Sequence, residues 1–270
     1  MSVAEPVIYD FGMNNGDDIE YYLLKCTRVV GVEANARLCA EVRARFPKEI
    51  DEGRLTILNV ALSDVDSKEP LTFYIHKNNH VLSQLPRPAA GEIDQFETVL
   101  VECRTPAGII REFGPPLYVK IDVEHYDQVV LANLFTAGIL PPEISAESHS
   151  IGVFSQLVVS GYNSFSLVDG RTVATKYGNA FIQTTEGTRR FAFKHHSAGP
   201  FGDDIQAPWE DRETFFHTLS AAGLGWKDIH ASRIIPPEPR PTNAVLAGRQ
   251  LRALAGKVLF AIKWRTIDRL

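Results

Sequence analysis

The stretch Val7–Gly16, which reads VIYDFGMNNG, is the part of the sequence that best indicates the fold. The mostly apolar run Val7–Phe11 ends at Gly12, as a buried strand does where it enters a tight turn. Beyond Gly16, the segment Asp17–Lys25 repeats apolar residues at helical spacing. A strand, a glycine-containing turn and a helix in this order form the first half of a βαβ unit.

The same alternation of strand and helix patterns continues for about 150 residues beyond this unit. It favours an α/β fold with a seven-stranded, mostly parallel sheet and helices on both faces. The predicted strands are Val7–Phe11, Val29–Val32, Leu55–Val60, Leu117–Val123 and Glu143–Ala146, with Ser164–Val168 and Ala180–Gln183 as a closing pair; the predicted helices are Asp17–Lys25, Arg37–Phe46, Thr105–Glu112, Asp127–Ala137 and Ser150–Ser160.

The pattern changes after Gln183, and we expect two regions in the chain. The first is a ligand-binding domain that carries an irregular hairpin insert, with strands at Leu71–Ile75 and Thr98–Cys103. The second is a C-terminal extension. The expected bounds are residues 1–185 for the domain, 64–104 for its insert and 186–270 for the extension, which comprises a loop near 194–204, a proline-rich strap at 233–243 and a basic amphipathic helix over 244–270.

Composition narrows the functional classes. The formal net charge of −5 over 270 residues argues against a nucleic-acid partner. Three scattered cysteines fit neither a disulfide framework nor a zinc site, and with no secretory signal or long apolar run they predict a cytoplasmic protein. Residues 245–270 hold six Lys or Arg and one acid, so this end can contact anionic lipid or, more commonly, pack on its own domain or a second subunit.

Ligands of parallel α/β sheets bind beyond the carboxyl ends of the strands, where this sequence places polar residues. Asp10 precedes the glycine turn and suits a ligand with an ammonium group. Glu33 follows the second strand and can accept both hydroxyls of a ribose, and Asn59–Asp64 can bracket an adenine edge. The glycine spacing lacks the GxGxxG fingerprint of dinucleotide enzymes. These features together favour S-adenosylmethionine (SAM).

The fourth such place is Lys120–His125, after the fourth strand. Carboxylates in a partly buried cleft there can abstract a proton or hold a metal. Glu124 could instead cap the next helix, and we expect His125 to face solvent.

Three of these segments resemble the FkbM family of SAM-dependent methyltransferases. Asp10–Gly16 resembles its D-V-G-A-N-x-G signature, Asn59–Asp64 its N-x-A-L-S-D segment and Leu117–Glu124 its L-K-I-D-V-E-G segment, over roughly residues 5–185. The resemblance implies a Rossmann-like class I methyltransferase fold and O-methylation of a hydroxyl on a sugar, glycan or secondary metabolite. Met13, in place of a small residue, and His125, in place of glycine, depart from the family pattern.

Taken together, the strand ends and the resemblance predict the residues that contact SAM. The predicted residues are Asp10, Gly12, Asn14, Asn15, Gly16, Glu33, Ala34, Ala61, Leu62, Ser63 and Asp122.

Methyl transfer to oxygen needs an aligned acceptor and a base for its proton. His149, beyond the fifth strand, and Asp122 are the candidate bases, with Glu147 beside them. A divalent metal held by Asp122, Glu147 and a neighbour is an alternative that we do not favour. Two other functions stay open, namely a nicotinamide-dependent oxidoreductase and a non-catalytic module that binds SAM or another nucleoside.

Overall fold

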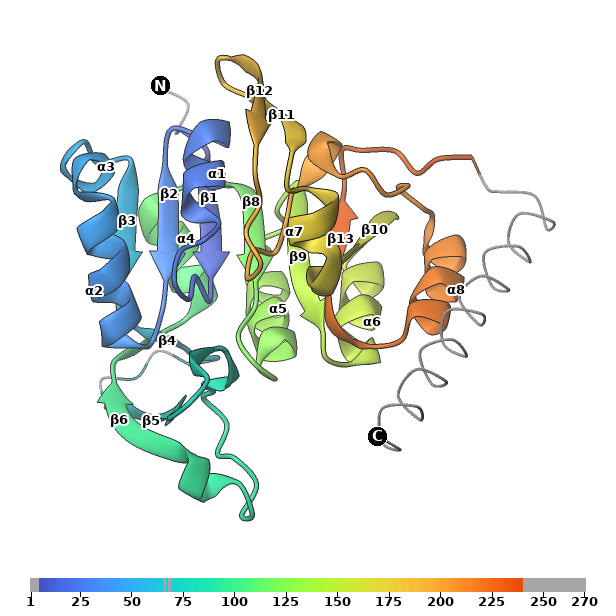
Figure 1. Cartoon of the computed structure of the whole chain (residues 1–270). Coiled ribbons are helices and arrows are strands. Elements are labelled where there is room, and N and C mark those ends of the chain that lie inside the picture. Colours follow the sequence, from blue (N-terminus) through green and yellow to red (C-terminus); the bar gives the residue numbers. More distant parts are fainter. Residues whose placement is uncertain (1–4, 66, 68, 240–270) are drawn as a thin grey trace, which may run out of the picture.

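The computed structural model describes residues 5–65, 67 and 69–239, and its centre is one seven-stranded sheet (Figure 1). The strand order is β10-β13-β9-β8-β1-β2-β3. The five strands β9, β8, β1, β2 and β3 are parallel to one another. β13 runs antiparallel to its two neighbours, β9 and β10. The strands are β1 Val7–Phe11, β2 Val29–Val32, β3 Leu55–Leu58, β8 Pro116–Ile121, β9 Glu143–Ser148, β10 Ser164–Asp169 and β13 Gly225–Ser232.

This arrangement confirms the predicted α/β fold with a mostly parallel sheet, and its strand order is that of the class I methyltransferase fold. Two details of the prediction are wrong. The segment Ser164–Val168 does not pair with Ala180–Gln183, because β10 pairs with β13. The sheet also draws a strand from beyond residue 185, so the expected domain boundary there would cut the sheet.

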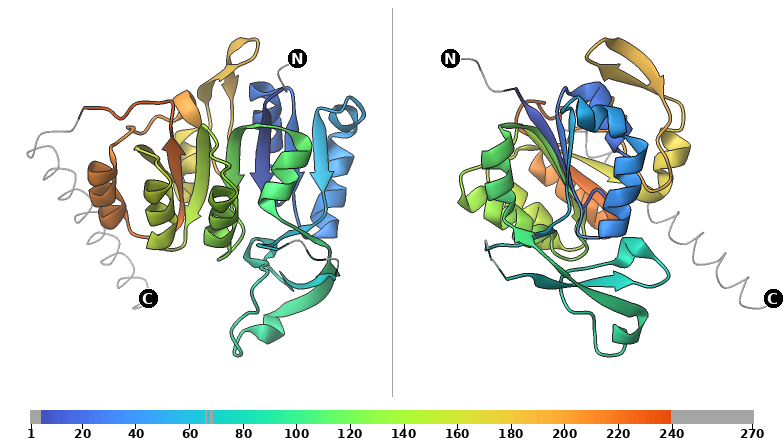
Figure 2. Two further views of the ribbon diagram at one scale, coloured as in Figure 1. Left: turned by 180° about the vertical axis from the view of Figure 1, so that it is seen from behind. Right: turned by 90° about the vertical axis from the view of Figure 1, so that its left-hand side faces the viewer.

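Helices cover both faces of the sheet (Figure 2). One core contains residues of α1 and α2, and residues 193–209 also pack into it. The other core contains residues of α4, α5, α6 and α8. The helices are α1 Ile19–Lys25, α2 Ala36–Arg45, α3 Pro47–Asp51, α4 Pro106–Phe113, α5 Asp127–Thr136, α6 Ile151–Val159, α7 Val173–Lys176 and α8 Arg212–Ala222, with short 3-10 turns η1 His80–Leu82, η2 Ile93–Gln95, η3 Gly170–Thr172 and η4 Gly202–Asp204.

Local sequence explains where the helices nearest the site begin. Asn35 caps α2, since its side chain accepts a hydrogen bond from the Arg37 backbone N–H at 3.0 Å. Thr105 caps α4 in the same way, and Pro106 follows at the first helical position. Pro47, just beyond the end of α2, takes the first position of α3.

An insert between β3 and α4 extends beyond the carboxyl ends of the strands (Figure 1, lower part). The antiparallel pair of β5 and β6 forms its body, and the short parallel strands β4 and β7 connect it to the domain. A second hairpin, of β11 and β12, lies outside the main sheet. These strands are β4 Ala61–Leu62, β5 Leu71–His76, β6 Phe96–Val101, β7 Cys103–Arg104, β11 Ala180–Thr184 and β12 Gly187–Phe191.

The predicted basic helix over 244–270 and the end of the proline-rich strap lie outside the described residues. Within the part of the chain that is described, no helix has the length and apolar character needed to cross a membrane. The three cysteines are buried free thiols.

Candidate functional site

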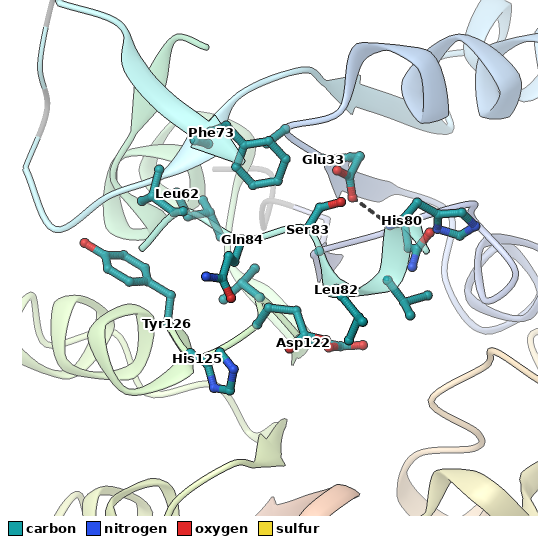
Figure 3. A pocket seen from close by; sticks show the side chains of 18 of the residues that line it. Glu33, Leu62, Phe73, His80, Leu82, Ser83, Gln84, Asp122, His125 and Tyr126 are labelled. Atoms are coloured by element: carbon teal, nitrogen blue, oxygen red, sulfur yellow. Dashed lines mark hydrogen bonds between the residues drawn. The ribbon is translucent and has the colours of Figure 1, made fainter. Parts of the chain in front are cut away.

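A cavity of about 570 Å³ lies at the carboxyl ends of the central strands. Its floor comes from the ends of β1, β2, β8 and β9, and residues 79–85 of the insert form a wall. Figure 3 shows Leu82, Ser83 and Gln84 of this wall in the pocket that also holds Glu33 and Asp122. Of the predicted site residues, the cavity is lined by Gly12, Asn14, Glu33, Ala34, Ala61, Leu62, Asp122, Glu147 and His149.

The turn after β1 is shaped by close contact with the end of β8. Gly12 has a φ of +84°, and a Cβ there would lie 1.8 Å from the carbonyl oxygen of Asp122. Only glycine allows the two strand ends to approach this closely. Gly16 and Asn15 do not line the cavity: Gly16 packs on Val42 of α2, and the Asn15 side chain accepts a hydrogen bond from the Asp17 N–H.

Glu33 is held in place at the end of β2 by two backbone groups. Its Oε2 accepts a hydrogen bond from the Asn14 N–H at 3.0 Å, and its Oε1 accepts one from the Asn35 N–H at 2.8 Å. Burial raises the pKa of Glu33, although the two hydrogen bonds act in the opposite direction. Each oxygen keeps a second lone pair, so the carboxylate can accept two further hydrogen bonds from neighbouring hydroxyls of a ligand.

Asp10 does not line the cavity, although the sequence predicts that it contacts SAM. It is buried beneath the turn, and the Nζ of Lys120 lies 3.2 Å from its Oδ1. The same Nζ lies 3.3 Å from Oδ2 of Asp122 and donates a hydrogen bond to the Gly12 carbonyl at 2.7 Å. Asp10 therefore acts through Lys120, which ties the ends of β1 and β8 together, and not as a partner for a ligand ammonium.

The predicted adenine side of the cavity lies next to the insert. Ala34, Ala61 and Leu62 line it together with Phe73 of β5, which gives this end an apolar character. Ser63 is buried and lies outside the lining. A flat aromatic base fits such an apolar slot better than a charged group does.

The opposite end of the cavity is acidic. Asp122 and Glu124 follow β8, and Glu147 lies at the end of β9 with His149 just beyond it. The Nε2 of His149 lies 2.9 Å from Oε2 of Glu147 and 3.6 Å from Oε2 of Glu124, but it is not aligned for a hydrogen bond to either. The ligand atoms of Glu124, Glu147 and His149 all lie within 4.8 Å of one another, which is close enough for one cation.

Burial and crowding shift the pKa values at this end. Burial, with the charges of Asp122 and Glu147, raises the pKa of Glu124 to about 8. Burial lowers the pKa of His149, but its contact with Glu147 and the nearby Asp127 and Glu124 more than offset this effect and raise the pKa to about 9. Both shifts follow from carboxyl groups packed closely together in a partly buried space.

His125 is exposed, as predicted, but it also lines the cavity. Its ring centre lies 4.8 Å from that of His149, and its backbone has a φ of +66°. The backbone thus keeps the left-handed conformation suited to the glycine that the FkbM pattern has here. Figure 3 shows the His125 side chain together with Asp122 and Tyr126 among those that line the pocket.

Sequence reasoning missed two parts of the cavity. Residues 79–85, which read NHVLSQL, lie between the two predicted strands of the insert, and no pattern indicates that they fold back over the strand ends. Glu124 is not among the predicted site residues, but it lines the cavity beside Glu147 and His149. The E-x-H spacing of Glu147 and His149, set against two acids after the neighbouring strand, is the signal that could have found this group.

The chain matches no protein-family model, and no curated protein matches it. Similar solved structures include an FkbM methyltransferase from Methylobacillus flagellatus KT (14% identity, TM-score 0.38, covering 61% of this chain and 40% of that one). They also include a SAM-dependent O-methyltransferase from Thermotoga maritima (9%, 0.37, 88% and 62%) and an O-methyltransferase from Bacillus cereus in complex with SAH (10%, 0.36, 85% and 74%).

The chain therefore spans well under half the length of that FkbM methyltransferase. At these low identities and TM-scores, the fold assignment rests on the strand order of the sheet.

Proposed function

We propose that the protein is a SAM-dependent methyltransferase that transfers the methyl group to a hydroxyl of a sugar, a glycan or a secondary metabolite. The observation that carries the proposal is one continuous cavity with a fixed carboxylate, Glu33, and an apolar slot at one end and ionisable side chains at the other. Adenosine fits the first end, and the sulfonium then lies toward Asp122. The O-methylation and the acceptor class come from the FkbM resemblance.

The acidic end supplies the base for the acceptor proton. Asp122 is the more open candidate, with 38% of its side chain exposed, and it lines the cavity beside Glu147. His149 turns its Nε2 toward two carboxylates, so this nitrogen is poorly placed to receive a proton from the acceptor. We therefore favour Asp122 as base, with Glu147 and His149 shaping its surroundings.

The two other functions predict different ligands. A nicotinamide-dependent oxidoreductase would bind NAD, which the glycine spacing of residues 12–16 disfavours. A non-catalytic module would bind SAM without needing the acidic end. Calorimetric titration with SAM, S-adenosylhomocysteine and NAD distinguishes the methyltransferase from the oxidoreductase. Heat of binding on titration with NAD but not with SAM would overturn our proposal. Incubation with methyl-labelled SAM and a panel of sugars, glycans and phenols distinguishes the methyltransferase from a non-catalytic module, because only the enzyme transfers the label.

Glu33→Gln should weaken SAM binding by about tenfold or more, equivalent to about 1.4 kcal/mol. The amide has one acceptor oxygen in place of two, and its NH₂ group would face the N–H of Asn14 or Asn35. Calorimetry of the purified variant measures the effect.

Glu41→Gln is the matched control, since Glu41 lies on the exposed face of α2 and pairs with Arg37 in solvent. It should bind SAM as the unmodified protein does. Equal affinity of the Glu33 and Glu41 variants would show that Glu33 does not contact the ligand.

A further inference from the structure

We propose that Glu124, Glu147 and His149 form a binding site for one divalent transition-metal cation such as Mn²⁺. The proposal rests on the proposed function only for the use of the cation, and not for its binding. The site lies at the acidic end of the cavity, open to the space where the acceptor would sit.

The distances between the ligand atoms suit one cation. Ligands bound at about 2.1 Å and at right angles to each other stand about 3 Å apart, and opposite ligands stand about 4.2 Å apart. The Nε2 of His149 lies 2.9 Å from one carboxylate and 3.6 Å from the other. This nitrogen is buried and faces both carboxylates, and it makes no hydrogen bond of good geometry to either.

Buried carboxylates next to this group form a second, independent observation. Asp127, at the start of α5, is 1% exposed, and its Oδ2 has no hydrogen-bond partner. Asp228 of β13 is 3% exposed, has an unpartnered Oδ1 and stands opposite Glu147 in the antiparallel register. Residues in such register point to the same sheet face, so Asp228 lies beside Glu147.

Few positive charges balance these acids. Lys120 approaches Asp122 but also approaches Asp10, and its position is fixed by the Gly12 carbonyl. The carboxyl groups of Asp127 and Asp228 are buried in the same region. Burying a carboxylate without a balancing charge is costly, and a bound dication would offset that cost.

The ligand set indicates which cation fits. One imidazole and two carboxylates favour Mn²⁺ and its neighbours over Ca²⁺ and Mg²⁺, which prefer oxygen ligands alone. Bound there, the cation would polarise an acceptor hydroxyl, and Asp122 would take the proton while the oxygen attacks the methyl group of the sulfonium. The methyl–sulfur bond breaks as the methyl–oxygen bond forms, so no other reactant is needed.

The test uses the full chain, freed of metal with a chelator and titrated with MnCl₂ in the absence of SAM. Electron paramagnetic resonance of free Mn²⁺ and calorimetry should show one saturable site per chain. Glu147→Gln and His149→Ala should weaken this binding by more than ~100-fold, since even outer-shell changes at metal sites cost 10- to 100-fold. His196→Ala is the matched control, because His196 lines the cavity but is outside the group, and it should bind Mn²⁺ normally.

Thermal unfolding separates a lost site from a lost fold. Mn²⁺ should raise the melting temperature of the unmodified protein and of His196→Ala but not of Glu147→Gln, and Glu124→Gln should behave like Glu147→Gln. The absence of saturable binding up to about 1 mM Mn²⁺, or equal affinity in all four variants, would overturn the proposal. A SAM titration run in parallel keeps the two proposals apart, since SAM binding without Mn²⁺ binding removes only this inference.

Discussion

His125 occupies a backbone conformation that costs an L-residue about 1 kcal/mol or more, and glycine is free of that cost. The strained residue lies on the cavity and contacts the ring of His149. Strain of this kind persists only where the surroundings hold it, and it is often found at functional sites. The imidazole is therefore a feature of the cavity to examine by mutation.

We expect His125→Gly to be more stable than His125→Ala by about 1 kcal/mol. Both variants lose the imidazole, but only glycine relieves the strain at φ +66°. Urea unfolding of the two proteins measures the difference in the free energy of unfolding. Equal stability would mean that the backbone at this position relaxes in solution.

Single residues were predicted from the sequence with uneven success. Glu33 could be placed at the cavity because it directly follows a buried strand, and strand ends have a fixed position in a parallel sheet. The burial of Asp10 could not be foreseen, because it depends on Lys120 reaching across from β8. That contact depends on register between strands, which sequence spacing does not encode.

At the scale of elements, the turn after β1 and the strand β2 fit each other as a pair. Met13 is 2% exposed, and a Cβ at Gly31 of β2 would lie 2.5 Å from its Sδ. The larger side chain at position 13 is therefore accommodated by the missing side chain at position 31. This accounts for the second departure from the FkbM pattern by packing alone.

Gly31→Ala should destabilise the protein by about 1–3 kcal/mol through overpacking. In a Met13→Ala background the same change should cost much less, because the space over residue 31 is then open. A double-mutant cycle on urea unfolding gives the coupling energy between the two positions. Additive effects would show that Met13 does not occupy this space in solution.

Elements with apolar sequences were predicted, and those with polar sequences were missed. β1, β2 and β8 are mostly apolar and mostly buried, so their patterns were sufficient. β13 reads GWKDIHAS, and its Lys227, Asp228, His230 and Ser232 are buried among other polar groups. A strand whose inward residues are polar resembles a surface loop in sequence, and only the completed sheet reveals it.

At the scale of the whole molecule, the sheet is completed by a strand from far along the chain. β13 lies between β9 and β10, which precede it by about 60 residues or more. Without β13, each of these two strands would have an unpaired edge facing the other. The residues up to 185 therefore do not contain a complete sheet.

A fragment of residues 1–185 should fail to unfold cooperatively, whereas residues 1–239 should do so. The first lacks β13 and α8, and with them Phe215, Leu219 and Ile229 of the core. Circular dichroism during urea titration distinguishes the two outcomes. A cooperative transition in the shorter fragment would show that β9 and β10 are stable without their shared neighbour.

The floor and one wall of the cavity come from different stretches of the chain. Glu33 and the acids after β8 and β9 belong to the sheet, whereas the wall over them, residues 79–85, belongs to a segment that can be exchanged between β4 and β7. Changes in the insert would therefore reshape one wall of the cavity while the sheet residues that form its floor stay unchanged. A library that randomises only this wall would measure how far ligand binding changes while the sheet remains intact.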